Sequence, residues 1–503
     1  MRKGSITLYL SLLLGVLLTL ICAGLFSVRR AAGRVVLASA AEQGMFSLFS
    51  RYDRTLLDKY GILAIDGGYS KEQLKLSALQ TEAEEVVEFL LGDSGDLLGP
   101  SNLTHLTAER GEVTGYTLLT DQEGALFRQQ ILRAASGKKA ASVMQDLKGQ
   151  MNVHSSEWEQ LEMQRKSIDV EADLQEYDNL KEGVRNNETM EASGDLSAAD
   201  LRQIADAVFC VLENSEAQDE TTAPAVLPEN ENPIELIRGL QKLGIMNLVI
   251  PKGRQVSQCS MVENCVTKRE LQQGMGILPQ EENSIVDKVL LGEYILDSFT
   301  DFTTAKEGTS GAVQYQVEYA IGRKPTDVEN LKLVLNRLLA VREASNYLYL
   351  LQDPEKQEEV QAAALTVSTM IGLPVAEPVV AEVLRLCWAF GESVLDLREL
   401  LSGGKIPLIK DTSSWQLSLN MLTHIQEESL EQHGSENGLD YKWYLRLLLA
   451  TQGEEKLTGA AMDLVEDEIR HTEGKEGFRL DNCLVGMKIC FQAKQDHLYG
   501  MKA

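Results

Sequence analysis

An apolar run near the N-terminus constrains this chain more than any other feature. Ser5–Val28 is 24 residues long and uncharged, with Arg2 and Lys3 before it and Arg29 and Arg30 after it. A helix needs about 20 apolar residues to cross a bilayer, whereas the core of a secretory signal has roughly 7–15. We therefore expect a retained transmembrane helix over residues 5–28, preceded by a short cytoplasmic tail of residues 1–4.

Two points about this run remain open. A cleaved signal peptide is the alternative, because Cys22, Ala23 and Gly24 are small residues where a signal peptidase would cut. Positive charges flank both ends of the run, so the positive-inside rule hardly favours one orientation over the other. The short N-terminal tail and the long acidic segment that follows favour an extracytoplasmic location for the bulk of the chain. The expected localisation is the cell membrane, with a single pass.

Composition limits the kinds of partner. The chain has 48 basic and 75 acidic residues and a net charge of −27. No basic patch is available to meet phosphates, which argues against nucleic-acid binding. The roughly 470 residues beyond the apolar run are too many for one ordinary core, so two or three subdomains are expected.

The cysteines favour structural roles or plain thiols over metal binding, because none clusters with histidine at a metal-ligand spacing. Cys259 and Cys265 bracket five residues of a polar loop, where a short disulfide is sterically allowed. Cys483 and Cys490 are seven residues apart in a strand-like segment, an odd offset that places them on opposite faces of a regular strand.

The apolar helix is expected to continue beyond the membrane. No proline occurs from Arg29 to Tyr60, and apolar residues recur at helical spacing. The first half of this stem is rich in alanine and glycine. A small-residue face lets another helix approach closely, although alanine is also simply a good helix former.

Residues 121–213 predict a helical projection. A heptad seam runs from Met144 to Ala172, with polar breaks at His154 and Arg165. We expect either a helical hairpin, with Leu196–Leu212 packing back, or an intermolecular coiled coil in a homodimer. The apolar seam residues that would form this helix–helix interface are Met144, Leu147, Met151, Trp158, Leu161 and Ile168. Residues 214–233 are acidic, contain three prolines and predict a linker.

Residues 234–503 predict a helix-rich α+β region. The expected helices are 284–302, 327–351, 358–371, 378–401, 439–450 and 454–471. The expected strands, including two nearer the N-terminus, are 62–65, 104–118, 313–319, 415–422 and 478–491. The fold class is α+β and helix-dominated, with a small antiparallel sheet.

Motifs that carry chemistry are missing from the sequence. We find no phosphate-binding loop, nucleophile elbow, zinc-protease or dinucleotide-binding pattern. Gly403 and Gly404 follow a helix rather than precede one, which is typical of a C-cap and not of a phosphate site. We therefore expect no catalytic, cofactor-binding or metal-binding residue, and a protein that is not an enzyme.

Several blocks of sequence resemble one uncharacterised family. They are Lys3–Leu12, Tyr60-Gly61, Gly292–Leu296, Leu386–Glu392 and Gly403–Leu408. The family is found in Gram-positive bacteria, typically among tight-adherence (Flp-type) pilus genes. The resemblance implies a plan similar to the TadE/TadG minor pilin-like proteins, with residues 29–120 forming the stem helix and a pilin-like α+β region.

Pilus processing is the second implication of the resemblance. Flp-type prepilins are cut after a glycine and carry a glutamate at the fifth position beyond it. Gly4 occupies the glycine position here, but Tyr9 stands where the glutamate would be. The resemblance thus implies an accessory protein that assists pilus assembly or secretion, with other pilus proteins and the membrane as partners. The alternatives from the residues are a membrane-tethered enzyme acting on wall polymers and a dimeric scaffold or sensor.

Overall fold

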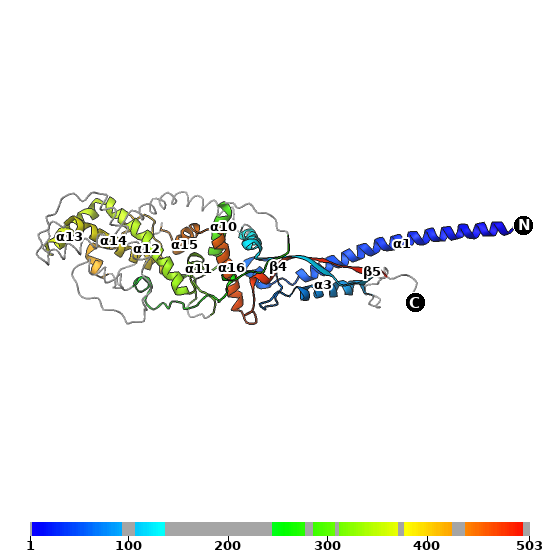
Figure 1. Ribbon diagram of the computed structural model, residues 1–503. Coiled ribbons are helices and arrows are strands. Elements are labelled where there is room, and N and C mark those ends of the chain that lie inside the picture. Colours follow the sequence, from blue (N-terminus) through cyan, green and yellow to red (C-terminus); the bar gives the residue numbers. More distant parts are fainter. Residues whose placement is uncertain are drawn as a thin grey trace. The chain divides into compact units, whose positions relative to one another are not determined.

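A computed structural model of the chain falls into two compact units (Figure 1). The residues that it describes are 3–92, 106–135, 244–276, 285–306, 311–370, 377–424 and 438–495. Unit 1 takes in residues 1–134, 264–283 and 465–503, and unit 2 takes in residues 135–263 and 284–464. Each unit therefore combines segments that are distant in sequence, a grouping that the linear division of the sequence did not anticipate.

Unit 1 is built on a helix of 47 residues, α1 (Lys3–Phe49), which is about 70 Å long at 1.5 Å per residue. Its C-terminal half packs against α3 (Leu76–Leu91), beside which it lies in Figure 1. In the sequence, the short helix α2 (Arg54–Tyr60) follows α1 and precedes α3. A further helix spans residues 121–135. The expected continuation of the apolar helix beyond residue 28 is confirmed.

The stem differs from the prediction at its end. The expected single helix to Tyr60 stops at Phe49 and restarts as α2. Asp53 causes the restart, because its carboxylate caps α2 by accepting from the backbone N–H of Thr55 at 2.8 Å and of Leu56 at 3.2 Å. Gly61 then ends α2 in the left-handed conformation (φ 71°), which glycine adopts without steric cost.

The sheets of unit 1 are small and antiparallel. In the larger one, β4 (Cys483–Cys490) lies between β1 (Ile65–Asp66) and β3 (Glu112–Leu118). In the other, β2 (Leu106–Ala108) pairs with β5 (Ala493–Gln495). Both predicted extended regions, 62–65 and 104–118, contribute strands, but each strand pairs with the C-terminal end of the chain instead of with its neighbour in sequence.

Unit 2 is helical. Its helices are α9 (Ile245–Val249), α10 (Ile285–Ser298), α11 (Gln316–Gly322), α12 (Asp327–Gln352), α13 (Pro354–Met370), α14 (Glu377–Leu401) and α15 (Tyr441–Ala450). The helix α16 (Glu454–Arg470) begins in this unit, and its last residues belong to unit 1. Short 3-10 turns are η1 (Val266–Lys268) and η4 (Leu480–Asn482) in unit 1 and η3 (Leu419–His424) in unit 2. The helix-dominated α+β fold class is confirmed.

Two predicted strands in unit 2 are wrong. Residues 313–319 lead into α11 instead of forming a strand. Apolar and polar residues alternate there, which predicts a strand with one exposed face, but the polar residues Gln316 and Glu318 are buried as well. Glu318 is 0% exposed and accepts hydrogen bonds from the Phe302 N–H and the Tyr441 hydroxyl, both at 2.8 Å. The segment 415–422 is a loop that enters η3. Its backbone N–H groups at 416 and 417 donate to a glutamate side chain instead of to a neighbouring strand.

Several predictions fall outside the described residues. They are the seam from Met144 to Ala172, the helix 196–212 and the linker 214–233. The proposed helix–helix interface and the homodimer that depends on it stay predictions.

Candidate functional site

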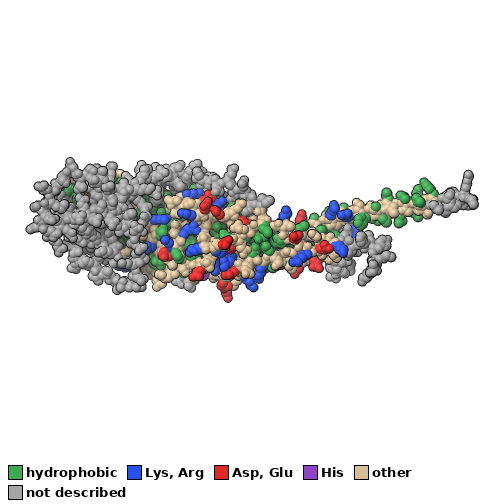
Figure 2. Space-filling view, in the orientation of Figure 1, with side chains coloured by type: hydrophobic (Ala, Val, Ile, Leu, Met, Phe, Trp, Pro, Cys, Tyr) green, Lys and Arg blue, Asp and Glu red, His purple; other side chains and the backbone are tan. Residues whose placement is uncertain are grey.

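The first candidate site is the exposed part of α1. From Tyr9 to Val28 every side chain is exposed, including Leu20 at 72% and Val28 at 68%. Figure 2 shows these apolar side chains along the N-terminal part of the helix. Among the described residues α1 is the one helix that is long and apolar enough to cross a membrane. Gly4, the predicted processing position, lies within its first turns.

The second half of α1 differs because one face of it is buried. Gly33, Leu37, Ala40, Gly44 and Leu48 form this face, at steps of four, three, four and four residues. A Cβ added at Gly44 would lie 2.9 Å from a methyl group of Val87 and 3.1 Å from the carbonyl oxygen of Ala83. Of the small residues in the first half of the stem, Ala40 packs against Val87 and Leu91 of α3, whereas Ala31, Ala32 and Ala38 are exposed.

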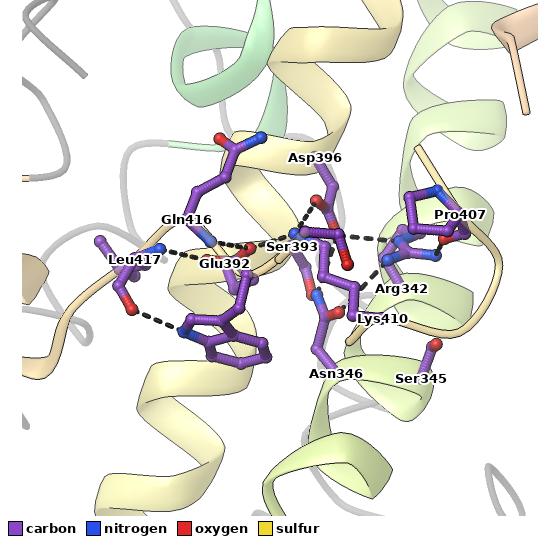
Figure 3. Close-up of polar contacts among 12 residues, drawn as sticks. Arg342, Ser345, Asn346, Glu392, Ser393, Asp396, Pro407, Lys410, Gln416 and Leu417 are labelled. Atoms are coloured by element: carbon purple, nitrogen blue, oxygen red, sulfur yellow. Dashed lines mark hydrogen bonds and ion pairs between the residues drawn. The ribbon is translucent and has the colours of Figure 1, made fainter. Parts of the chain in front are cut away.

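The second candidate site is a buried ionic cluster in unit 2 (Figure 3). Arg342 on α12 donates from Nε to Asp396 on α14 at 2.9 Å. Lys410, in the segment after α14, contacts Asp396 at 2.6 Å and also pairs with Glu392. All four side chains are at most 1% exposed, and their formal charges cancel. Burial of charge is costly unless each ion is paired and hydrogen-bonded, as these are.

The cluster fixes the loop that follows α14. Arg342 donates to the carbonyl oxygens of Pro407 and Leu408, both at 2.8 Å. Glu392 accepts from the backbone N–H groups of Gln416 at 2.9 Å and Leu417 at 2.7 Å. Each end of the loop is thus bound by a charged side chain projecting from a helix.

Neutral polar groups complete the cluster. Asn346 donates to Ser393 and to Asp396, both at 2.9 Å, and the Tyr444 hydroxyl lies 3.2 Å from Arg342. Burial raises the pKa of Asp396, but the neighbouring Arg342 and Lys410 outweigh burial and hold this pKa below its usual value. Asp396 therefore stays ionised at neutral pH, whereas burial raises the pKa of Glu392 despite its pairing with Lys410.

Two of the five sequence blocks that carried the family resemblance contribute to this cluster. Glu392 and the buried Trp388 come from the block Leu386–Glu392, and Trp388 donates to the carbonyl oxygen of Leu417 at 2.9 Å. Pro407 and Leu408 come from the block Gly403–Leu408. Sequence reasoning missed Arg342, which lies in none of the blocks and reads as a charge on an exposed helix face.

The other predicted sites are placed as follows. Cys259 is half-buried in unit 2, and Cys265 is buried in unit 1, each as a thiol. The disulfide between them stays a prediction. Cys483 is buried and Cys490 is exposed, at the two ends of β4. In the described residues, no group of three or more His, Cys, Asp or Glu side chains is placed to hold a metal ion.

These features define a helix-dominated α+β protein with one apolar N-terminal helix of membrane-spanning length. A family model matches residues 225–495, which is more than half of the 503 residues. The chain belongs to that family, DUF5702, a family of unknown function. No curated protein and no solved structure matches the chain. The matched residues contain the ionic cluster, whereas α1 lies outside them.

Proposed function

We propose that this chain is a membrane-anchored extracytoplasmic accessory protein, similar in plan to minor pilins, that assists a tight-adherence pilus or a related secretion system. It acts by binding other proteins of the assembly, without catalysing a reaction of its own. The observation that carries the proposal is α1, one continuous helix with an exposed apolar part and a part packed onto a folded unit.

The length of α1 supports this plan. A span over residues 5–28 leaves about 21 residues of helix beyond the membrane, or about 30 Å. Unit 1 packs along this stem, with Ala40 of α1 against Leu91 of α3, and the stem is helical without a break to Phe49. A rigid connection between the span and the folded unit suits a protein that positions partners at the membrane surface.

The charge and the sequence blocks give further support. A net charge of −27 suits a soluble extracytoplasmic domain and disfavours wide contact with anionic lipid. The blocks Lys3–Leu12 and Gly403–Leu408 are similar to those of a family found among pilus genes. Tyr9, at the position of the prepilin glutamate, favours a retained anchor beside the assembly machinery over a subunit of the shaft.

The experiment is a clean deletion of the gene, scored by surface piliation under the electron microscope. We expect loss or strong reduction of filaments, restored by the full chain and not by a chain that lacks residues 5–28 but carries a cleavable secretion signal. Unaltered piliation in the deletion strain would refute the proposal. Restoration by the unanchored chain would refute the requirement for the membrane span.

A further inference from the structure

A pocket opens in unit 1 where the stem helix ends. It has a volume of about 290 Å³. Its apolar wall is formed by Leu48, Ile65 and Leu79, which belong to the buried core of this unit. Charged and aromatic side chains line the remainder, among them two arginines, two tyrosines and three carboxylates.

Two of the carboxylates are already occupied by groups of the chain. Asp53 caps α2 with one oxygen and accepts from Lys475 at 2.5 Å with the other. Asp66 accepts from the backbone N–H of Ser70 at 2.6 Å. This contact helps hold a turn in which Tyr69 and Ser70 are both left-handed, with φ of 54° and 57°. Neither acid is left to attract a cation into the pocket.

The third carboxylate, Glu82, is occupied as well. It accepts from the Tyr69 hydroxyl at 2.8 Å and forms an ion pair with Arg51. Burial, followed by the hydrogen bond to Glu82, raises the pKa of Tyr69 to about 12, so this hydroxyl keeps its proton and stays a donor. All three carboxylates of the pocket therefore already accept hydrogen bonds from groups of the chain itself.

The hydrogen-bond donors of the wall are not all used. Arg54 is exposed, and its guanidinium forms no hydrogen bond or ion pair with the residues that the structure describes. Tyr52 is half-buried, and its hydroxyl likewise forms no hydrogen bond with the described residues. Arg51 is 53% exposed and has five N–H donors, more than its pairing with Glu82 requires. The pocket thus combines an apolar floor with spare donors from three side chains.

We propose that this pocket binds a carboxylate of a partner polypeptide, an acidic side chain held by the spare donors of Arg51, Tyr52 and Arg54. The planar guanidiniums of Arg51 and Arg54 match a carboxylate in geometry and charge. At about 290 Å³, the pocket lies at the lower end of the roughly 300–1,000 Å³ of small-molecule sites, a size that also suits a single side chain. Arginine and tyrosine are also the residue types that dominate interface hot spots.

The test uses the full chain in detergent micelles and three hexapeptides, Ac-Gly-Ser-Leu-X-Ser-Gly-NH2, in which X is Glu, Gln or Lys. Saturation-transfer NMR on the peptides measures weak binding directly. We expect the Glu peptide to bind at least fivefold more tightly than the Gln or Lys peptide. An absence of preference for Glu would overturn the proposal.

Variants locate the binding. Arg54→Gln should weaken binding of the Glu peptide at least fivefold without affecting folding, because Arg54 has no partner among the described residues. Arg110→Gln is the matched control, since Arg110 is exposed in the same unit and does not line the pocket. Equal effects of the two variants would overturn the assignment.

A competition experiment with inorganic phosphate completes the test. If phosphate displaces the Glu peptide at millimolar concentration and binds Arg54 with equal strength, the pocket is a general anion site, and the polypeptide assignment fails. This inference does not depend on the proposed role in pilus assembly.

Discussion

Two contacts, the helix pair α1–α3 in unit 1 and the ionic cluster in unit 2, are stabilised in different ways. In unit 1, α1 and α3 approach so closely that Gly44 has no room for a side chain. In unit 2, α12, α14 and the loop after α14 meet around four fully buried charges. The close helix contact tolerates little added volume, whereas the ionic cluster tolerates little change of charge. A larger side chain should therefore break the helix contact, and the loss of a charge should break the ionic cluster.

The largest effect is expected at the ionic cluster. Asp396→Ala removes a carboxylate that contacts both Arg342 and Lys410 and leaves more buried positive charge than Glu392 can balance. Breaking a buried ion pair costs about 3–5 kcal/mol. Denaturant unfolding followed by tryptophan fluorescence measures the loss, since Trp388 and Trp415 belong to unit 2.

Asp297→Ala is the control for this variant. Asp297 pairs with Lys442 in the same unit, but the two side chains are 69% and 38% exposed. Exposed pairs contribute about 0–1 kcal/mol. Similar losses from Asp396→Ala and Asp297→Ala would show that the buried cluster is not what holds unit 2 together.

An intermediate effect is expected at the contact between α1 and α3. Gly44→Leu forces the helices apart, because Val87 and Ala83 occupy the space. We expect a loss of about 1–3 kcal/mol, seen as faster hydrogen exchange in α3. Gly24→Leu, in the exposed part of the same helix, meets no atom within 4 Å and should leave the exchange unchanged. Equal exchange in the two variants would contradict the packing described.

The smallest effect, when counted per pH unit, is expected at Glu318, whose contacts in unit 2 differ from those of the cluster. Burial, with a contribution from Asp301, raises the pKa of Glu318 to about 8. The folded protein then holds this proton more tightly than the unfolded chain. The free energy of unfolding should therefore fall as the pH rises from about 4.5 to about 8, by at most about 1.4 kcal/mol per pH unit.

Glu318→Gln isolates this contribution. The amide oxygen still accepts from Phe302 and Tyr441 but does not titrate. Melting temperatures measured from pH 5 to pH 9 should fall less steeply in the variant than in the native protein. Identical slopes would mean that Glu318 does not titrate in this range.

The sequence predicted those features that depend on local pattern. The apolar run predicted the exposed part of α1, and the glycines after Leu401 predicted the turn in which Gly403 is left-handed, with φ of 90°. These properties follow from helix length and backbone conformation, which nearby residues decide.

Features that depend on distant residues were not predictable. The central position of β4 requires segments about 370 and 420 residues away to pair with it, as in the registers Leu118–Leu484 and Ile65–Leu484. The ionic cluster brings Arg342 to Asp396 and Lys410, which read as solvated charges when each is taken alone.

The central claim is that α1 holds the chain in the membrane with unit 1 on the outside. Cys490 tests it directly, because it is an exposed thiol of unit 1 at the end of β4. Intact protoplasts are treated with a membrane-impermeant maleimide, membranes are isolated, and labelling is compared with that of Cys490→Ser. We expect labelled protein of full-length mass in the membrane fraction, with the label absent or reduced in the variant. Labelling of Cys490 only after lysis, or recovery of the protein outside the membrane fraction, would contradict the account.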